Sequence, residues 1–452
     1  MRKILFPIIV ILLSVSFGCT KNDSAPAKNA IITTIAATGI RLDSALVTGD
    51  ITLNADDKPI LESGICYATT TTPDLTKLTV VNTVPSGVFT CTLSGLHSKV
   101  KYFVRAYFKN STGVTYGNEV SFTAASFPTV VGNKYFNGPV HALCADAFGN
   151  VYAGGAFFTE GNGSSWTYMA KWDGSNWSSV GDLRSGSIIR TISTNAAGNI
   201  YTAIRKFNTG IEYDMVKFDG SSWNDVGVYN TFNFLITASC TDAVGNVYAI
   251  GTYLNAAGKY FVAKWGPSGY SELGSFDSVP TSICVDAAGN LYAAGLMNHG
   301  NNFSHFYIAK WNGNAWSEVG DFNNLIQSVC IGHDGNLLAT GAFTNTAGNY
   351  YVAKLTGSTW SQVGDLGIVR DYYTANDIKQ MCVSKSGNIY AIGDFTLATG
   401  IRRVKKWDGK EWSVLATFNS DIFAICADPN DNVFVGGSFT GKDGLWYVAK
   451  CN

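Results

Sequence analysis

The chain has few residues whose types and spacing could support catalysis. No H-E-x-x-H zinc motif and no G-x-S-x-G nucleophile elbow is present. His299 and His305 share the stretch "NHGNNFSHF", where two imidazoles could hold a metal ion or act as an acid/base pair, but no carboxylate stands beside them. Paired carboxylates of a glycosidase would come from separate parts of the chain and leave no local motif, so that alternative stays open.

Aspartates recur in a pattern that could indicate calcium. The stretch "DAAGNLYAAG" (286–295) returns in near copies at 146–155, 195–204, 242–251, 333–341, 385–393 and 428–437. Calcium takes six to eight oxygen ligands, whereas the repeated Asp brings one carboxylate to each loop. We therefore interpret this Asp as an acceptor for turn amides and the Asn that follows Gly as a residue at positive φ. The sequence predicts no metal and no other cofactor.

Cysteines and lysines recur with the same copies. A cysteine six residues before the turn asparagine fits a small buried slot, and without C-x-x-C the case for zinc or thiol-redox chemistry is weak. The lysines could line a basic channel, but a residue present in every copy is better explained by packing beside an aromatic ring. Cys66 and Cys91, upstream of the copies, could pair or stay free. The recurring residues are Cys144, Cys240, Cys284, Cys330, Cys382 and Cys426, and Lys171, Lys217, Lys264, Lys310, Lys354, Lys406 and Lys450.

The recurring stretch belongs to a longer repeat that must position these residues. Its turn asparagines follow one another at steps of 49, 47, 44, 46, 52 and 44 residues. A unit of this length with four short strands is typical of a propeller blade, so the sequence predicts a seven-bladed β-propeller over residues 125–452. The seventh unit ends after its third strand, and "PTVVGN" (128–133) resembles the missing fourth. We expect strand 128–132 to close the ring.

Two known groups of propeller repeats are similar to these units. The pattern D-x-x-G-N-x-Y resembles bacterial repeats of the NHL and SBBP kind, and G-G-x-F-T…A-K-W-D-G…W-x-x-V-G resembles secreted kelch-like repeats. Neither group fixes an activity, so the resemblance implies architecture, and a function has to be argued from a site.

Residues 31–124 show alternating strands with regular turn signals, which predicts a β-sandwich. Leu96 followed six residues later by Tyr102 resembles a tyrosine corner, and "YFVRAYFKNSTG" resembles strand F and its turn in fibronectin type III domains. With "SGICYATTTTPDL" and "TYGNEVSFTA", the segment is similar to the divergent form on surface lipoproteins of the Bacteroidetes type. The predicted fold class is therefore all-β, a fibronectin type III-like sandwich followed by a propeller.

The N-terminus resembles a bacterial lipoprotein signal. Two basic residues precede an apolar run that ends in "SFGC". This predicts a signal peptide at 1–18, lipidation of Cys19 and a flexible tether at 19–30. The resemblance implies an exported protein anchored in the outer membrane, on its periplasmic side or its surface. The alternative is a plain signal peptide with a chance cysteine.

Charge and loop variation indicate binding rather than catalysis. The net charge is −1, which gives no electrostatic reason to bind nucleic acid. The second-to-third strand and inter-unit connections vary and are rich in aromatic and amide residues, which suits a glycan or a protein partner. The alternatives are a polysaccharide hydrolase or lyase and a purely structural or adhesion spacer. The candidate ligand-binding residues are Arg205, Tyr229, His299, His305, Arg370, Tyr372, Tyr373 and Arg402.

Overall fold

A computed structural model describes most of the chain from Ala30 onward. The described residues are 30–38, 40, 44–54, 57–83, 86–97, 100–124, 128–133, 136–157, 168–181, 183, 188–205, 213–226, 235–299, 302–368, 377–393, 402–441 and 444–451. They form strands and turns, with one 3-10 turn at Val131–Asn133. Among them, no helix is long and apolar enough to cross a membrane.

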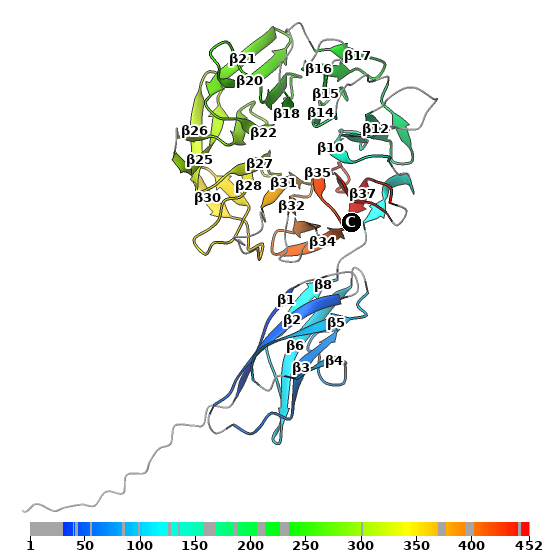
Figure 1. The fold of residues 1–452 in the computed structure, drawn as a ribbon, viewed down its shortest axis with the longest axis vertical. Coiled ribbons are helices and arrows are strands. Elements are labelled where there is room, and N and C mark those ends of the chain that lie inside the picture. The colour runs from blue at the N-terminus through cyan, green and yellow to red at the C-terminus, as the bar shows by residue number, and fades with distance from the viewer. Residues whose placement is uncertain are drawn as a thin grey trace, which may run out of the picture.

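The first domain is a sandwich of two antiparallel sheets (Figure 1). One sheet has the order β1-β2-β5, and the other has the order β4-β3-β6-β7, with β8 paired to β6. Buried and exposed residues alternate along β2 and β5, as expected for strands with one face on a core. The strands are β1 (Ile31–Thr38), β2 (Ser44–Thr52), β3 (Glu62–Ala68), β4 (Leu78–Asn82), β5 (Gly87–Ser94), β6 (Lys101–Asn110), β7 (Gly113–Tyr116) and β8 (Val120–Thr123).

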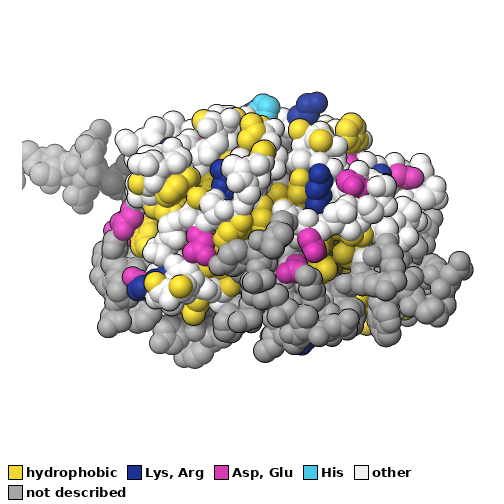
Figure 2. Space-filling model, turned by 90° about the horizontal axis from the view of Figure 1, so that it is seen from above, with side chains coloured by type: hydrophobic (Ala, Val, Ile, Leu, Met, Phe, Trp, Pro, Cys, Tyr) yellow, Lys and Arg dark blue, Asp and Glu magenta, His cyan; other side chains and the backbone are white. Residues whose placement is uncertain are grey.

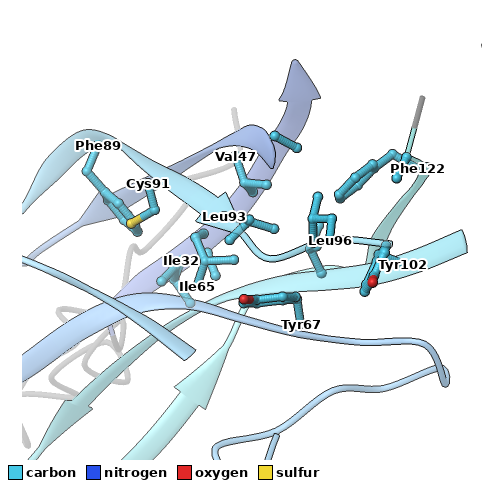
Figure 3. Packing of buried hydrophobic residues seen from close by; sticks show 14 of the residues in the cluster. Ile32, Val47, Ile65, Tyr67, Phe89, Cys91, Leu93, Leu96, Tyr102 and Phe122 are labelled. Atoms are coloured by element: carbon cyan, nitrogen blue, oxygen red, sulfur yellow. The ribbon is translucent and has the colours of Figure 1, made fainter. Parts of the chain in front are cut away.

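The predicted tyrosine corner is present in this sandwich (Figure 3). Leu96 and Tyr102 are both buried in the domain core, and the backbone N–H of His97 donates to the Tyr102 hydroxyl over 2.9 Å. Cys66 and Cys91 are buried and free, so the possible disulfide between them is not formed. Instead each thiol lies within hydrogen-bonding distance of backbone carbonyls.

The second domain is a ring of seven antiparallel sheets, which is the predicted seven-bladed propeller (Figure 1). Residues of all seven blades line a cavity at its centre, which we call the central channel. The blades are β10 (Val140–Ala145), β11 (Val151–Gly155), β12 (Met169–Trp172), β13 (Trp177–Ser179); β14 (Ile192–Thr194), β15 (Ile200–Arg205), β16 (Tyr213–Phe218), β17 (Trp223–Asp225); β18 (Ile236–Thr241), β19 (Val247–Gly251), β20 (Tyr260–Gly266), β21 (Gly269–Phe276); β22 (Pro280–Val285), β23 (Leu291–Gly295), β24 (Asn298–His299), β25 (Asn302–Trp311), β26 (Trp316–Phe322); β27 (Ile326–Ile331), β28 (Leu337–Gly341), β29 (Ala353–Thr356), β30 (Thr359–Gln362); β31 (Ile378–Val383), β32 (Ile389–Gly393), β33 (Arg402–Trp407), β34 (Trp412–Phe418); and β35 (Ile422–Ala427), β36 (Val433–Gly437), β37 (Ala449–Cys451) with β9 (Thr129–Val130).

The last blade joins the two ends of the propeller segment. Strand β9 pairs with β37, with Val130 opposite Ala449. The next residue, Val131, is buried, its amide donates to Val448 O, and its carbonyl accepts the Trp177 indole N–H. The segment 128–132 therefore supplies the fourth strand of blade 7 and a contact to blade 1.

Tryptophans at the start of the fourth strands lock neighbouring blades together. The Trp316 indole donates to Leu273 O of the preceding blade over 3.1 Å, and Trp412 donates in the same way to Val363 O over 2.7 Å. The repeated glycine of W-x-x-V-G makes room for the next blade's rings, because a Cβ on Gly274 would lie 2.3 Å from the Trp316 ring. This explains why the motif recurs in most units.

The repeated turn is held by its aspartate, as predicted. In blade 4, Asp286 accepts from the amides of Ala288 and Asn290, from the Asn290 side chain and from the Tyr292 hydroxyl. The prediction that Asn takes the positive φ is wrong, because Gly289 has φ of +84° and carries the left-handed conformation. The asparagine is needed instead for its side-chain amide, which binds the aspartate.

Candidate functional site

Each blade begins its inner strand at the mouth of the central channel. In six blades this strand carries a β-bulge, in which one extra residue stands between two paired ones; in blade 1, Val140 lies opposite Gly155 and Ala142 lies opposite Gly154, which leaves His141 unpaired. The same register shift occurs in blades 3 to 7. A bulge turns a side chain away from the regular strand face, so the fold offers one such position per blade.

A glycine at the end of the second strand allows this bulge to form. A Cβ on Gly155 would lie 2.2 Å from Pro139 O, and one on Gly341 would lie 2.2 Å from Leu325 O, so only glycine fits beside these carbonyls. Blade 2 has Ile204 at this position. Its inner strand pairs only from Ile192 onward and shows no bulge. Arg190 nevertheless stands at the equivalent position in the sequence.

The residues at this position form a ring that we call the channel-mouth ring. Its seven members, in blade order, are His141, Arg190, Thr237, Thr281, Gln327, Lys379 and Phe423. They line a cavity of about 370 Å³ together with the two residues that follow each of them in blades 1 to 6 and with Ile422 and Ala424 in blade 7. The seven positions carry six residue types, although the blades share their framework. A ligand in the cavity would therefore meet a different chemical group from nearly every blade.

The ring carries groups of different chemistry. Arg190 and Lys379 are basic, Thr237, Thr281 and Gln327 are polar and uncharged, and His141 and Phe423 carry rings. The rings of His141 and Phe423 are stacked, with centroids 4.7 Å apart and planes 7° from parallel. Burial and the nearby Arg190 guanidinium lower the pKa of His141. At neutral pH the imidazole is therefore uncharged, and Arg190 and Lys379 are the cations of the ring.

Below this ring, the next layer of polar side chains is engaged within the protein. Thr191 and Ser239 share a hydrogen bond of 2.8 Å between their hydroxyls, across blades 2 and 3. Ser282 accepts the amide of Val329 over 3.0 Å, and Gln380 accepts that of Ile425 over 3.3 Å. These contacts each join neighbouring blades, so this layer fixes the spacing of the inner strands.

The predicted ligand-binding residues do not form one site in the described part of the chain. Arg205 ends β15, opposite Tyr213 of β16. Arg402 begins β33, where its Nε donates to Asp421 over 2.7 Å in an ion pair. His299 and His305 lie in the paired strands β24 and β25 of blade 4. Cys19, Tyr229, Arg370, Tyr372 and Tyr373 lie outside the described residues.

The channel-mouth ring is not among the predicted ligand-binding residues, because its members stand at the start of the inner strands and not in the long variable connections. Its members are nevertheless readable from the sequence, since each stands nine residues before a turn asparagine, as His141 does before Asn150. A position fixed in spacing but variable in type, next to positions that repeat, is the signal that could have found them. The ring lies at the start of the inner strands, on the face where the variable connections also join.

The repeated lysines and cysteines take framework positions. Lys171, Lys264 and Lys310 lie over the rings of Tyr152, Tyr248 and Tyr292, at 5.9, 5.8 and 5.5 Å from the centroids. The repeated lysines do not line the channel-mouth cavity, so the basic-channel alternative is wrong for this cavity. The repeated cysteines are free, and burial raises the pKa of Cys330 to about 12. Among the described residues, no group of three His, Cys, Asp or Glu side chains could hold a metal ion.

The outer rim of the propeller contrasts with the mouth. Where Figure 2 shows described residues on this rim, basic and acidic side chains are interspersed among hydrophobic and polar ones. The residues that line the channel-mouth cavity instead include two cations, Arg190 of blade 2 and Lys379 of blade 6, and no acidic side chain. A lining with cations and no carboxylate attracts an anion more strongly than a surface with interspersed charges of both signs does.

No protein-family model matches the chain, and no curated protein matches it in sequence. Similar solved structures include the β-propeller domain of the Trilobed protease from Pyrococcus furiosus, at 9% identity and a TM-score of 0.47 over 71% of this chain and 94% of that one. AofleA from Arthrobotrys oligospora is 9% identical, with a TM-score of 0.39 over 64% and 89%. The FN1–FN3 domains of chicken CNTN1 are 10% identical, with a TM-score of 0.15 over 73% and 93%. The chain's own strand order defines its fold.

Proposed function

We propose that the protein is an exported, lipid-anchored binding module whose ligand enters the channel mouth of the propeller. The observation that carries this is the channel-mouth ring: seven bulge-equivalent positions with six residue types, over a cavity of about 370 Å³. A position needed only for folding would repeat in every blade, as the turn asparagine does. Variation at a fixed, solvent-facing position is what a binding site built on a repeat requires.

The size and lining of the cavity favour a small polar ligand over a protein surface. Its volume is in the range of small-molecule pockets, about 300–1,000 Å³. Hydroxyl, amide and cationic groups meet there with one exposed aromatic ring, Phe423, which is 38% exposed. Of the two ligand classes that the sequence suggests, a glycan fits this arrangement better. A sugar presents several hydroxyls and an apolar face to the same site.

The lipid anchor is part of the proposal and is supported by the sequence "SFGC" alone. Replacing Cys19 with Ser should release the protein from the membrane fraction, because the thiol that carries the lipid would be absent. Matched fractionation of the wild-type chain provides the control. Continued attachment of the Cys19→Ser variant would contradict lipidation at this residue.

Binding is tested by probing the Cys19→Ser chain on a glycan array, alongside a variant in which Arg190, Gln327 and Phe423 are changed to Ala. We expect binding to at least one glycan, and loss of that binding in the triple variant. The control carries Lys385→Ala and Val244→Ala, two exposed positions on the turns at the other end of the blades. Glycan binding that the ring variant leaves unchanged would move the site away from the channel mouth.

A further inference from the structure

Blade 7 departs from the repeat at the turn end of its inner strand. In blades 1, 3 and 4 the repeated tyrosine donates its hydroxyl to Oδ2 of the turn aspartate, over 3.0, 2.9 and 3.1 Å. Blade 5 lacks both partners, since Gly332 and Leu338 stand at these two positions. Blade 7 keeps the aspartate, Asp428, but has Phe434 in place of the tyrosine. It is therefore the one blade whose sequence has the carboxylate without the hydroxyl.

The missing hydroxyl leaves an acceptor at Asp428, which is only 5% exposed. Its Oδ1 accepts the amides of Asn430 and Asn432, and its Oδ2 accepts the Asn432 side chain over 2.7 Å. In blades 1, 3 and 4, Oδ2 accepts from the tyrosine hydroxyl as well as from the asparagine side chain. A carboxylate oxygen can accept two hydrogen bonds, and buried polar atoms are normally supplied with partners. Oδ2 of Asp428 therefore has room for one more donor.

A cavity of about 370 Å³ opens beside this carboxylate, between blade 7 and blade 1. We call it the seam cavity. Blade 7 contributes Asp428, Phe434 and Lys450 to its lining, and blade 1 contributes Trp172. The two blades meet closely here, because a Cβ on Gly132 would lie 2.4 Å from the Trp172 ring. The seam cavity lies at the other end of the blades from the channel mouth and shares no lining residue with it.

The strand register brings Asp428 and Lys450 to the same aromatic ring. In blade 1, the Tyr152 hydroxyl donates to the turn aspartate, and the Lys171 ammonium lies 5.9 Å from the centroid of the Tyr152 ring. Phe434 lies opposite Lys450 as Tyr152 lies opposite Lys171. A group placed where the phenol oxygen would be thus has the carboxylate and the ammonium as neighbours. A hydroxyl suits this place, because it donates one hydrogen bond and accepts others.

We propose that the seam cavity binds a neutral saccharide, one of whose hydroxyls takes the place of the missing tyrosine hydroxyl. This hydroxyl donates to Asp428 and accepts from Lys450, while Trp172 offers an apolar wall to the C–H groups of the sugar. Asn430 also lines the cavity, and its amide can bind further hydroxyls. Asp173 adds a second carboxylate to the lining, so an acidic sugar would meet repulsion. The volume lies within the range of small-molecule pockets, about 300–1,000 Å³.

The test uses the Cys19→Ser chain with Arg190, Gln327 and Phe423 changed to Ala, so that the channel mouth does not contribute. NMR titration measures binding of the methyl glycosides of glucose, galactose, mannose and N-acetylglucosamine, with glycerol and methyl glucuronide for comparison. We expect at least one neutral glycoside to bind with a Kd of about 1 mM or below. Adding Phe434→Tyr should weaken this binding by roughly tenfold or more, because the new hydroxyl occupies the place at Asp428.

A second variant guards against misfolding. Phe434→Tyr introduces the residue that blades 1, 3 and 4 carry, so its melting temperature should not fall. If it does fall, Lys450→Met decides, because loss of the ammonium should also weaken binding by roughly tenfold. The matched control is Lys354→Met, at the same strand position of blade 5, which should leave the affinity unchanged.

The remaining outcomes separate this inference from the proposed function. The seam site is overturned if none of the four neutral glycosides binds, if glycerol or methyl glucuronide binds equally well, or if the folded variants keep the full affinity. These results leave the channel mouth untouched, because its residues are already substituted in the chain that is tested. Glycan binding that survives the channel-mouth substitutions on the array but is lost with Phe434→Tyr would support the seam site and contradict the proposed function.

Discussion

The two ends of the propeller's inner strands carry the same backbone and serve opposite purposes. At the turn end, Asp, Gly and Asn recur in near copies, and the Asp accepts the same set of hydrogen bonds in blades 1, 3 and 4. At the mouth end, a bulge recurs but its side chain differs from blade to blade. The backbone is repeated at both ends, whereas the side chains are repeated only where they hold the fold. The difference separates the residues that build the ring from those available for a ligand.

The largest expected effect comes from removing the strand that closes the framework. A fragment starting at Gly138 lacks β9 and Val131, and it leaves the edge of β37 unpaired. We expect it to aggregate or to melt roughly 10 °C or more below a fragment starting at Ala125, because a whole strand's pairing and the Trp177 contact are lost. Thermal melts followed by circular dichroism compare the two. Equal melting temperatures would mean that the ring does not depend on closure.

The next largest effect on stability is expected from a substitution of the glycine that lies opposite the bulge. Gly341→Ala puts a Cβ 2.2 Å from Leu325 O, so the bulge that displays Gln327 has to move. We expect a loss of about 1–3 kcal/mol in the free energy of unfolding, measured by urea titration. The control is Ile204→Ala, at the equivalent position of blade 2, which has no bulge. This substitution adds no Cβ beside a backbone carbonyl, so it should not displace the backbone. A stable Gly341→Ala variant would show that the carbonyl can move freely and that glycine is not required there.

At the turn end, we expect the loss of Asp286 to have a smaller effect on stability, and one that depends on pH. Burial alone would raise the pKa of Asp286, but hydrogen bonds from Asn290 and Tyr292 outweigh it and hold the pKa below its usual value. The charged form is therefore favoured in the folded state, and its contribution is present above about pH 4 and lost as the pH falls further. Asp286→Ala should cost about 1–3 kcal/mol at pH 7, since several hydrogen bonds lose their acceptor.

The measurement is urea unfolding of wild type and Asp286→Ala at pH 7 and pH 3, and we expect the two proteins to differ less at the lower pH. Blade 5 offers a natural comparison, because Gly332 stands where the other turn has its aspartate. Its nearby Asp334 accepts from Asn336 and pairs with Lys354. A gap in stability that is constant from pH 7 to pH 3 would contradict the role given to the Asp286 carboxylate.

The sequence was sufficient for the architecture because folding information is repeated seven times. Each unit carries its own turn, glycine and tryptophan signals, and the tyrosine corner rests on two residues only six apart, Leu96 and Tyr102. The channel mouth could not be seen in the same way. Arg190 and Lys379 are far apart in the chain, and the bulge that exposes the ring follows from a close approach between Gly155 and Pro139 O that spacing alone does not reveal. Features that lie within one repeat can be predicted from the sequence. The cavity is formed by residues of seven repeats, so it is visible only once the blades are arranged in the ring.

The smallest effect on stability is expected from substitutions at the channel mouth. This result tests whether side chains at the mouth end of the inner strands, unlike those at the turn end, are dispensable for folding. Changing Arg190 and Lys379 together to Gln keeps both side chains polar and removes the two cations of the channel-mouth ring. Surface changes of this kind usually alter stability by no more than about 0.5 kcal/mol. We expect urea unfolding to be unchanged within that margin while glycan binding at the channel mouth is weakened or lost. A loss as large as that of Asp286→Ala would place these residues in the framework, and the inner strands would then be structural at both ends.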